Sequence, residues 1–77
     1  KMFQQGDLLW LPQKTVLLQA LRTPQAIKII EKPEVGLYMK DSDEDSSFCI
    51  VVYDGREWVA NKKHIKLLRR DYASEVN

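Results

Sequence analysis

The chain has 77 residues, which limits it to one small domain near the lower size at which a hydrophobic core sustains itself. Hydrophobic residues make up 44% of it and charged residues 30%, a balance typical of folded rather than disordered proteins. The formal net charge of +1 gives no overall attraction to nucleic acid or to an anionic membrane, so any charged partner must be recognised by a local patch.

Several classes of function are not supported by the residues present. The chain has one cysteine, Cys49, so no intramolecular disulfide and no multi-cysteine metal site can form. Between Phe48 and Ile50, this thiol is expected to be a small buried hydrophobe. The single histidine, His64, has no partner in a recognisable catalytic set. We therefore expect a protein that is not an enzyme, with no cofactor and no metal.

The sequence also bears on where in the cell the protein is expected. No apolar run approaches the roughly 20 residues of a membrane-spanning helix, and no signal peptide is visible. We expect residues 1–77 to form a single domain of a larger intracellular protein, with residues 69–77 as a frayed tail.

The first predicted strand is Leu8–Leu11, which follows a Gly6-Asp7 turn and ends at Pro12, because proline donates no ladder hydrogen bond. Strand alternation places Leu9 and Leu11 on one face, with Leu8 and Trp10 on the other. Both pairs are apolar, so the pattern does not decide which pair enters the core.

Three further strands are predicted at residues 15–21, 26–30 and 35–40, separated by proline-containing turns. In the second of these we expect Ile27 and Ile29 to point inward and Lys28 outward. Gly36, inside the third, suggests a bulge or bend. An acidic, serine-rich segment follows at residues 41–47 and is expected to be an exposed loop.

The clearest local signal is a hairpin over residues 48–60. Its apolar run, 48–53, meets Asp54-Gly55, a pair that tolerates the positive φ angles of a type I′ turn. Within the first run we expect Ile50 and Val52 to face the core. Asn61 then resembles an N-cap for a single 3₁₀ turn, before a short closing strand at residues 65–68. The spacing of these runs predicts a closed or nearly closed all-β barrel of five or six strands.

Two stretches resemble a known family. They are the opening Gly6-Asp7-Leu8-Leu9-Trp10 and the later V-V-Y-D-G-x-x-W-V, residues 51–59, followed by Ile65 to Leu68. Together they resemble the SH3-like barrels of the Tudor, PWWP and chromo-barrel superfamily, in which an aromatic-Asp-Gly hairpin joins the third and fourth strands and a 3₁₀ turn precedes the fifth. The resemblance implies an all-β, five-stranded, Tudor-type SH3-like barrel with that turn before its last strand.

The resemblance also implies a binding site, an aromatic cage for a methylated lysine or arginine. A methylated ammonium keeps its charge but loses hydration, so aromatic π faces hold it well. The residues that match the cage are Trp10, Tyr53 and Asp54, with Tyr38 and Trp58 as further walls. The competing interpretation is that these rings fill the core of a small barrel. Arg56, next to the turn, would repel a cation.

A second candidate surface is the basic segment 56–70, which carries six lysines or arginines and one acidic residue. Similar barrels serve as tail domains of retroelement integrases, and this likeness suggests phosphate contacts from Lys62, Lys63, Lys66, Arg69 and Arg70. The competing interpretation is a solvated face that balances the acidic loop. Ser42, followed by three acidic residues, is also a candidate for acidophilic kinases.

We therefore predict a non-catalytic interaction module of a nuclear, chromatin-associated protein. Its partner is expected to be a peptide or histone tail, methylated or not, bound through the aromatic surface, and the chain itself to be a monomer or weak homodimer with no membrane contact. The alternatives are a nucleic-acid-binding barrel that uses the basic segment, and a structural domain that docks within its parent protein.

Overall fold

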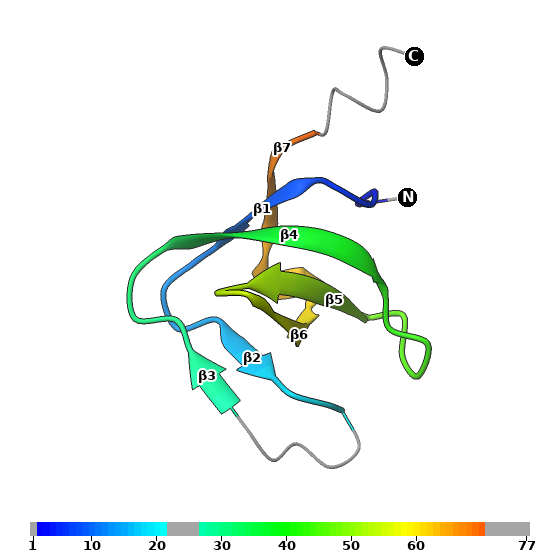
Figure 1. Ribbon diagram of the computed structural model, residues 1–77, viewed down its shortest axis with the longest axis horizontal. Helices are drawn as coiled ribbons and strands as arrows, with labels where there is room; N and C mark the ends of the chain where they lie inside the picture. The colour runs from blue at the N-terminus through cyan, green and yellow to red at the C-terminus, as the bar shows by residue number, and fades with distance from the viewer. Residues whose placement is uncertain (1, 22–26, 71–77) are drawn as a thin grey trace.

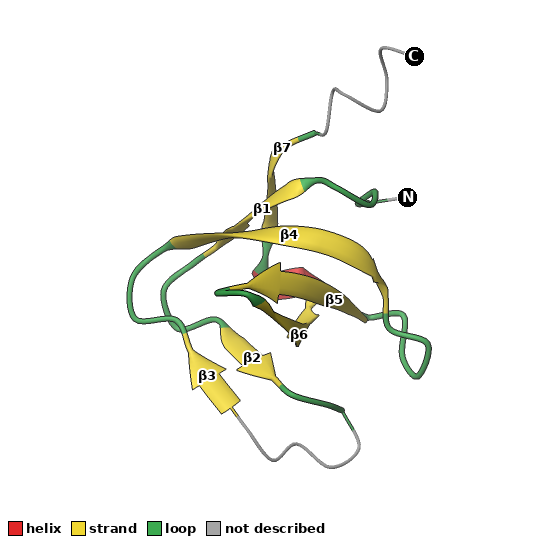
Figure 2. Cartoon of the chain, in the orientation of Figure 1, coloured by secondary structure: helices red, strands yellow, loops and turns green. Residues whose placement is uncertain are grey.

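The computed structural model describes residues 2–21 and 27–70, which form seven strands and one 3₁₀ turn (Figures 1 and 2). In chain order these are β1 (Leu8–Leu11), β2 (Val16–Leu18), β3 (Ile27–Ile29), β4 (Glu34–Asp41), β5 (Phe48–Tyr53), β6 (Arg56–Asn61), η1 (Lys62–His64) and β7 (Lys66–Arg69). Each strand overlaps a run that the sequence predicts as β, with bounds that extend one residue beyond that run in β4, β6 and β7. Short β-branched and aromatic runs between turn residues carry a strong local signal.

The strands form one antiparallel sheet in the order β3-β2-β6-β5-β4-β1-β7, and β4 arches over β5 and β6 in Figure 1. The all-β prediction is confirmed. The prediction of a closed five-stranded barrel is wrong, because β2 and β3 pair with each other and add a hairpin beside β6. The sheet consequently has seven strands and stays open, with β3 and β7 at its two ends.

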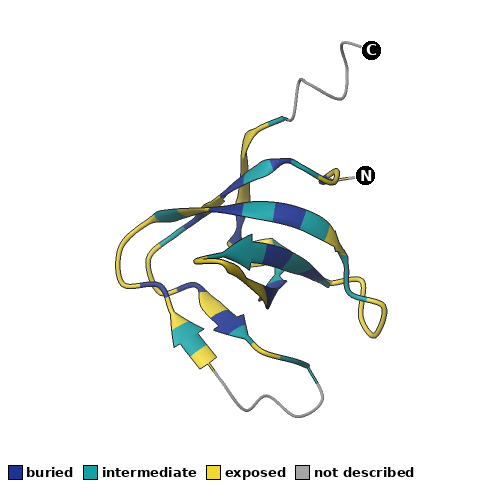
Figure 3. Cartoon of the chain, viewed as in Figure 1, coloured by how far each residue is buried: buried dark blue, intermediate teal, exposed yellow. Residues whose placement is uncertain are grey.

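The core lies on one face of this curved sheet, where Figure 3 shows buried segments on β1, β4, β5 and β6. Leu9 and Leu11 are fully buried, which settles the orientation of β1 that the sequence leaves open. In β5 the fully buried residues are Cys49 and Val51, so the prediction that Ile50 and Val52 face the core is wrong. The register explains this, since Val51 lies between two large core rings, those of Tyr38 and Trp58.

The edge hairpin corrects two further predictions. Ile27 and Ile29 are 60% and 56% exposed, whereas Lys28 lies opposite the buried Leu17 and points to the inner face. An edge strand has no neighbour on its far side, so its apolar residues are not forced inward. The irregularity in β4 lies between Tyr38 and Lys40 rather than at Gly36.

Gly36 has a packing role instead. A Cβ atom placed there would lie 3.1 Å from Leu11 Cδ1 and 3.4 Å from the Val52 carbonyl oxygen. A hydrogen at this position therefore lets β4 pass close to the side chain of Leu11, which is a steric rather than a conformational requirement.

The local turn and cap predictions are confirmed. Asp54 and Gly55 both have positive φ, 54° and 73°, as a type I′ turn requires. Asn61 caps η1, because its Oδ1 accepts a hydrogen bond of 2.9 Å from the Lys63 amide. The acidic segment is an exposed loop over residues 43–47.

One buried carboxylate connects the beginning and the end of the described chain. Asp7 is fully buried, and its Oδ2 accepts hydrogen bonds from the Gln4 amide at 2.8 Å and from Arg70 Nη1 at 2.9 Å. The predicted tail begins at residue 69, yet Arg69 belongs to β7 and Arg70 makes this ion pair. The remainder of the predicted tail, 71–77, lies outside the described residues.

Asp7→Ala should lower the free energy of unfolding by about 3 kcal/mol, because removal of one partner of a buried ion pair leaves the other poorly compensated. Urea denaturation measures this loss. The matched control is Asp43→Ala, since the Asp43–Lys40 pair is exposed and should contribute at most about 1 kcal/mol. A double-mutant cycle with Arg70→Met should show coupling between the two sites, and strictly additive losses would contradict the interaction.

Candidate functional site

The five residues predicted for an aromatic cage do not gather at one place. Tyr38 and Trp58 lie in the core on the inner face, at 5% and 6% exposure. Trp10 alternates with the buried Leu9 and Leu11, so it lies on the outer face and is 38% exposed. A cage that combines Trp10 with the other rings is therefore not formed.

Tyr38 is held as a core residue by its ring and its hydroxyl. Its ring lies 5.6 Å from that of Phe3, and its hydroxyl donates a hydrogen bond to Asp41 Oδ1. Burial, followed by the Asp41 carboxylate, raises the pKa of this hydroxyl well above its usual value. Tyr38 is thus mostly enclosed, although it also borders a small hollow of about 330 Å³ with Phe3 and Asp41.

The indole N–H and the ring of Trp58 likewise have partners within the chain. Its indole Nε1 donates a hydrogen bond of 3.2 Å to the Tyr53 carbonyl oxygen. The guanidinium of Arg56 lies over its ring at 5.0 Å from the centroid, which is a cation–π contact. Arg56, expected to repel a ligand cation, therefore covers the indole itself.

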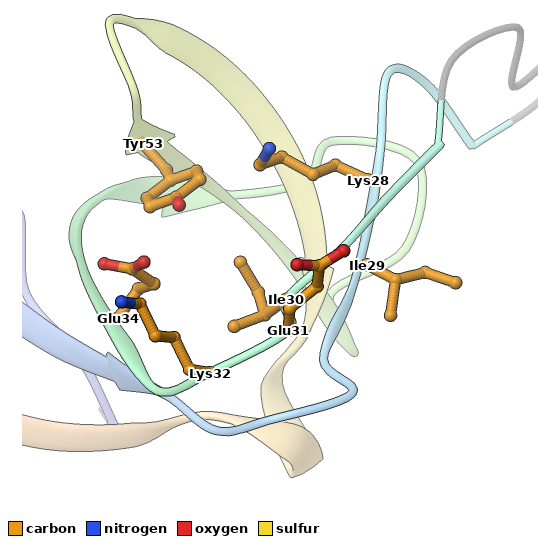
Figure 4. A pocket seen from close by; sticks show the side chains of 7 residues that line it. All are labelled: Lys28, Ile29, Ile30, Glu31, Lys32, Glu34 and Tyr53. Carbon is orange, nitrogen blue, oxygen red and sulfur yellow. The ribbon is translucent and has the colours of Figure 1, made fainter.

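Tyr53 borders the hollow shown in Figure 4. It is half-buried against the core, on the same inner face as Cys49 and Val51. The Nζ atom of Lys28 lies 5.7 Å from the centroid of its ring. Partial burial raises the pKa of its hydroxyl, and so do the nearby Glu34 and Asp54 carboxylates.

The hollow has a volume of about 570 Å³ and lies between β3, the β3–β4 turn and the end of β5. Charges of both signs surround one aromatic face. Its lining residues are Lys28, Ile29, Ile30, Glu31, Lys32, Glu34 and Tyr53. Asp54 lies next in the chain but is exposed in the turn, and it does not line the hollow.

Sequence reasoning missed the charged members of this hollow. The stretch Glu31-Lys32-Pro33-Glu34 was predicted only as a turn, and Lys28 was predicted to face outward. Turn composition predicts a change of direction but not what the turn faces, because that depends on the distant hairpin at Tyr53. The mixed charge of this turn was the feature of the sequence that could have indicated the hollow, and it is a weak signal.

Chemically, this arrangement is a cation site. An aromatic face attracts an ammonium or guanidinium group, and a carboxylate nearby strengthens that attraction. The ring of Tyr53 with Glu34 at its hydroxyl supplies both, and the amine of Lys28 occupies the position over the ring.

The predicted basic surface is partly neutralised. Lys62 pairs with Asp41 at 3.1 Å, and Arg70 pairs with Asp7 at 2.9 Å. Lys63, Lys66 and Arg69 are exposed. The ion pairs of Lys62 and Arg70 reduce the charge available for phosphate contacts. Nucleic-acid binding by this segment stays a prediction.

The remaining reactive side chains lie apart. Burial raises the pKa of the Cys49 thiol to about 12, with the Asp41 carboxylate adding to the shift. His64 is exposed and lines a separate hollow with Pro12, Gln13, Lys14 and Thr15. The Ser42 Oγ accepts a hydrogen bond of 3.3 Å from the Glu44 amide within the acidic loop. Over residues 2–21 and 27–70, no group of three or more His, Cys, Asp or Glu side chains is placed to hold a metal ion.

A scan against protein-family models finds no match, and neither do searches of curated proteins and of solved structures. Within the described part of the chain, no helix has the length and apolar character needed to cross a membrane.

Two raised pKa values predict how stability depends on pH. The Cys49 thiol and the Tyr38 hydroxyl ionise at lower pH in the unfolded chain than in the folded one. The contribution of these groups to the free energy of unfolding is therefore complete below about pH 9, and it is lost as the pH rises towards about 12. Guanidinium denaturation at about pH 7 and about pH 10 should show a lower free energy of unfolding at the higher pH.

Cys49→Ala tests the thiol's share of this effect. The variant should lose less stability between the two pH values than the original chain does, because only the tyrosines with raised pKa values, Tyr38 and Tyr53, then contribute. An identical loss in both chains would show that the thiol has no part in it.

Proposed function

We propose that this chain is a non-catalytic binding module that takes the cationic side chain of a lysine or arginine from a peptide in the hollow at Tyr53. The observation that carries the proposal is the Lys28 amine 5.7 Å from the Tyr53 ring centroid, with Glu34 at the tyrosine hydroxyl. The chain's own lysine marks the position that a ligand cation would take.

Exchange of the two cations is physically reasonable. Lys28 lies on β3, an edge strand, and its long flexible side chain can turn to solvent without disturbing the pairing of β2 and β3. The hollow then offers a π face and the carboxylates of Glu31 and Glu34. A peptide cation that enters must gain more from this environment than Lys28 does.

This competition favours methylated ligands. A methylated ammonium keeps its charge but is less strongly hydrated than the free amine of Lys28, so its transfer from water to the ring is less costly. With a single aromatic wall, the expected affinity is modest, and the neighbouring charges must supply part of the recognition.

The order of elements supports an SH3-like, Tudor-type assignment. β1, β4, β5, β6 and β7 run in the order expected for the five strands of that family, with the Asp54-Gly55 turn between the third and fourth and η1 before the fifth. The β2–β3 hairpin is then an addition between the first and second strands. A histone-tail ligand and a nuclear setting follow from this resemblance and belong to the proposal.

Tyr53→Leu tests the π face while retaining an apolar side chain against the core. We expect it to weaken binding of a trimethyllysine-containing peptide by about tenfold or more, because the cation–π contribution is removed. Tyr53→Phe is the matched control and should bind nearly as well as the original chain. Isothermal titration calorimetry measures both, and equal affinity of the leucine variant and the original chain would end the proposal.

Lys28→Gln should raise the affinity for the same peptide by at least about threefold, since the competing amine is removed and more of the protein is ready to bind. Lys32→Gln is the matched control, because it makes the same change of charge in the same hollow. A larger gain from the Lys32 change, or no binding by any of these chains, would contradict a cation site at Tyr53.

A further inference from the structure

We propose that the outer face of β1 and the open edge of β7 bind an extended acidic peptide segment of a partner protein, which adds to the sheet as an eighth strand. We call this surface the β1–β7 platform. It consists of Leu8, Trp10, Val35, Leu37, Lys66 and Arg69. It is separate from the hollow at Tyr53, because Trp10 and Tyr53 lie on opposite faces of the sheet.

The strand register places an exposed indole among apolar and basic neighbours. Trp10 lies directly opposite Val35 of β4 on one side and Lys66 of β7 on the other. Residues directly opposite in antiparallel strands have Cβ atoms roughly 5 Å apart, so these three side chains form one row. Trp10 and Val35 are both exposed, which is unusual for adjoining large hydrophobic residues.

The next row repeats this pattern. Leu8 lies opposite Leu37 of β4 and opposite Arg69 of β7. The platform therefore has an apolar centre and a basic margin, and the margin follows β7. Tryptophan and arginine are among the residue types enriched at energetically important positions of protein interfaces.

The backbone of β7 makes strand addition the suitable binding mode. β7 ends the sheet, and all four of its residues are exposed. The strand labelled β7 in Figure 1 is coloured yellow, as exposed, in Figure 3. Among residues 2–21 and 27–70, its only strand partner is β1. An extended peptide can use the amides and carbonyls of such an edge for affinity, while its alternate side chains supply specificity.

The side chains of β7 define the chemistry of the partner. Lys66 and Arg69 lie on the Trp10 face, whereas Leu67 lies opposite Leu9 towards the inner side and is 41% exposed. A strand added here would place alternate residues beside the two cations and beside Leu67. The complementary segment alternates acidic residues with apolar ones.

The same charges disfavour two other occupants. A second copy pairing through β7 would bring Lys66 and Arg69 close to the same cations of its partner, and such like-charged cross-strand pairs are destabilising. A nucleic acid would need an array of phosphate contacts, yet most of this platform is apolar. The acidic, partly apolar peptide is the occupant that satisfies both parts of the surface.

The direct test uses synthetic seven-residue capped peptides. In the glutamate peptide, glutamate alternates with valine. In the lysine peptide, lysine replaces each glutamate. The third peptide is the glutamate peptide with alternate backbone amides N-methylated, which blocks strand pairing. We expect the glutamate peptide to bind and to shift the amide resonances of Lys66 to Arg69, with little change at these amides from the other two peptides. A 12-base-pair DNA duplex, a length of about one helical turn, is titrated in parallel.

Charge reversal identifies the surface. Lys66→Glu should weaken binding of the glutamate peptide by about tenfold and strengthen binding of the lysine peptide. Trp10→Ala should weaken binding of the glutamate peptide by a similar factor. Lys40→Glu makes the same reversal at an exposed lysine outside both the platform and the hollow at Tyr53, and it should change little. Both platform residues are exposed, so circular dichroism should report an unchanged fold.

Three results would overturn the proposal. The first is no binding of the glutamate peptide, which would mean that Lys66 and Arg69 act only to prevent edge pairing. The second is equal binding of the N-methylated peptide, which would exclude strand addition. The third is tighter binding of the DNA duplex with shifts at the same amides, which would assign the platform to nucleic acid.

Discussion

The buried carboxylate of Asp7 is the interaction on which the arrangement of the sheet depends. Its side chain holds the Gln4 amide and Arg70, while the backbone of Asp7 exchanges hydrogen bonds with the chain around it, including one from the Tyr38 amide to the Asp7 carbonyl oxygen. β1 is thereby fixed between β4 and β7. A charge so deeply buried requires these partners, since an uncompensated carboxylate in the interior would be strongly unfavourable.

With β1 fixed in this way, the aromatic residues lie on both faces of the sheet, and their rings have different neighbours on each face. On the inner face the chain's own cations cover the rings, Lys28 over Tyr53 and Arg56 over Trp58. On the outer face Trp10 lies between Val35 and Lys66 in the register and stays exposed. A hairpin rich in aromatic residues thus does not provide an open cage by itself, because neighbouring cations compete for the same π faces.

The sequence predicted what depends on short-range chemistry. The strands, the Asp54-Gly55 turn and the Asn61 cap all rest on residues adjacent in the chain, and all three are present. The faces of β5 were predicted wrongly because Ile50, Val51 and Val52 are equally apolar, so alternation leaves no polar residue to mark the outside. The contact of Lys28 with Tyr53 could not be predicted, because it depends on how the β2–β3 hairpin docks against β6.

A single alternation in β1 links the core to the outer surface. Leu9 and Leu11 fill the interior, and the residue between them, Trp10, is necessarily turned outward beside Lys66. The exposed indole is therefore not a failure of packing but a consequence of how β1 pairs on both sides. Because a buried position and an exposed one alternate along the same strand, substitutions at Trp10 can alter recognition while Leu9 and Leu11 continue to hold the fold. The inner hollow at Tyr53 and the outer platform are accordingly independent surfaces of one sheet, and a partner at one leaves the other accessible.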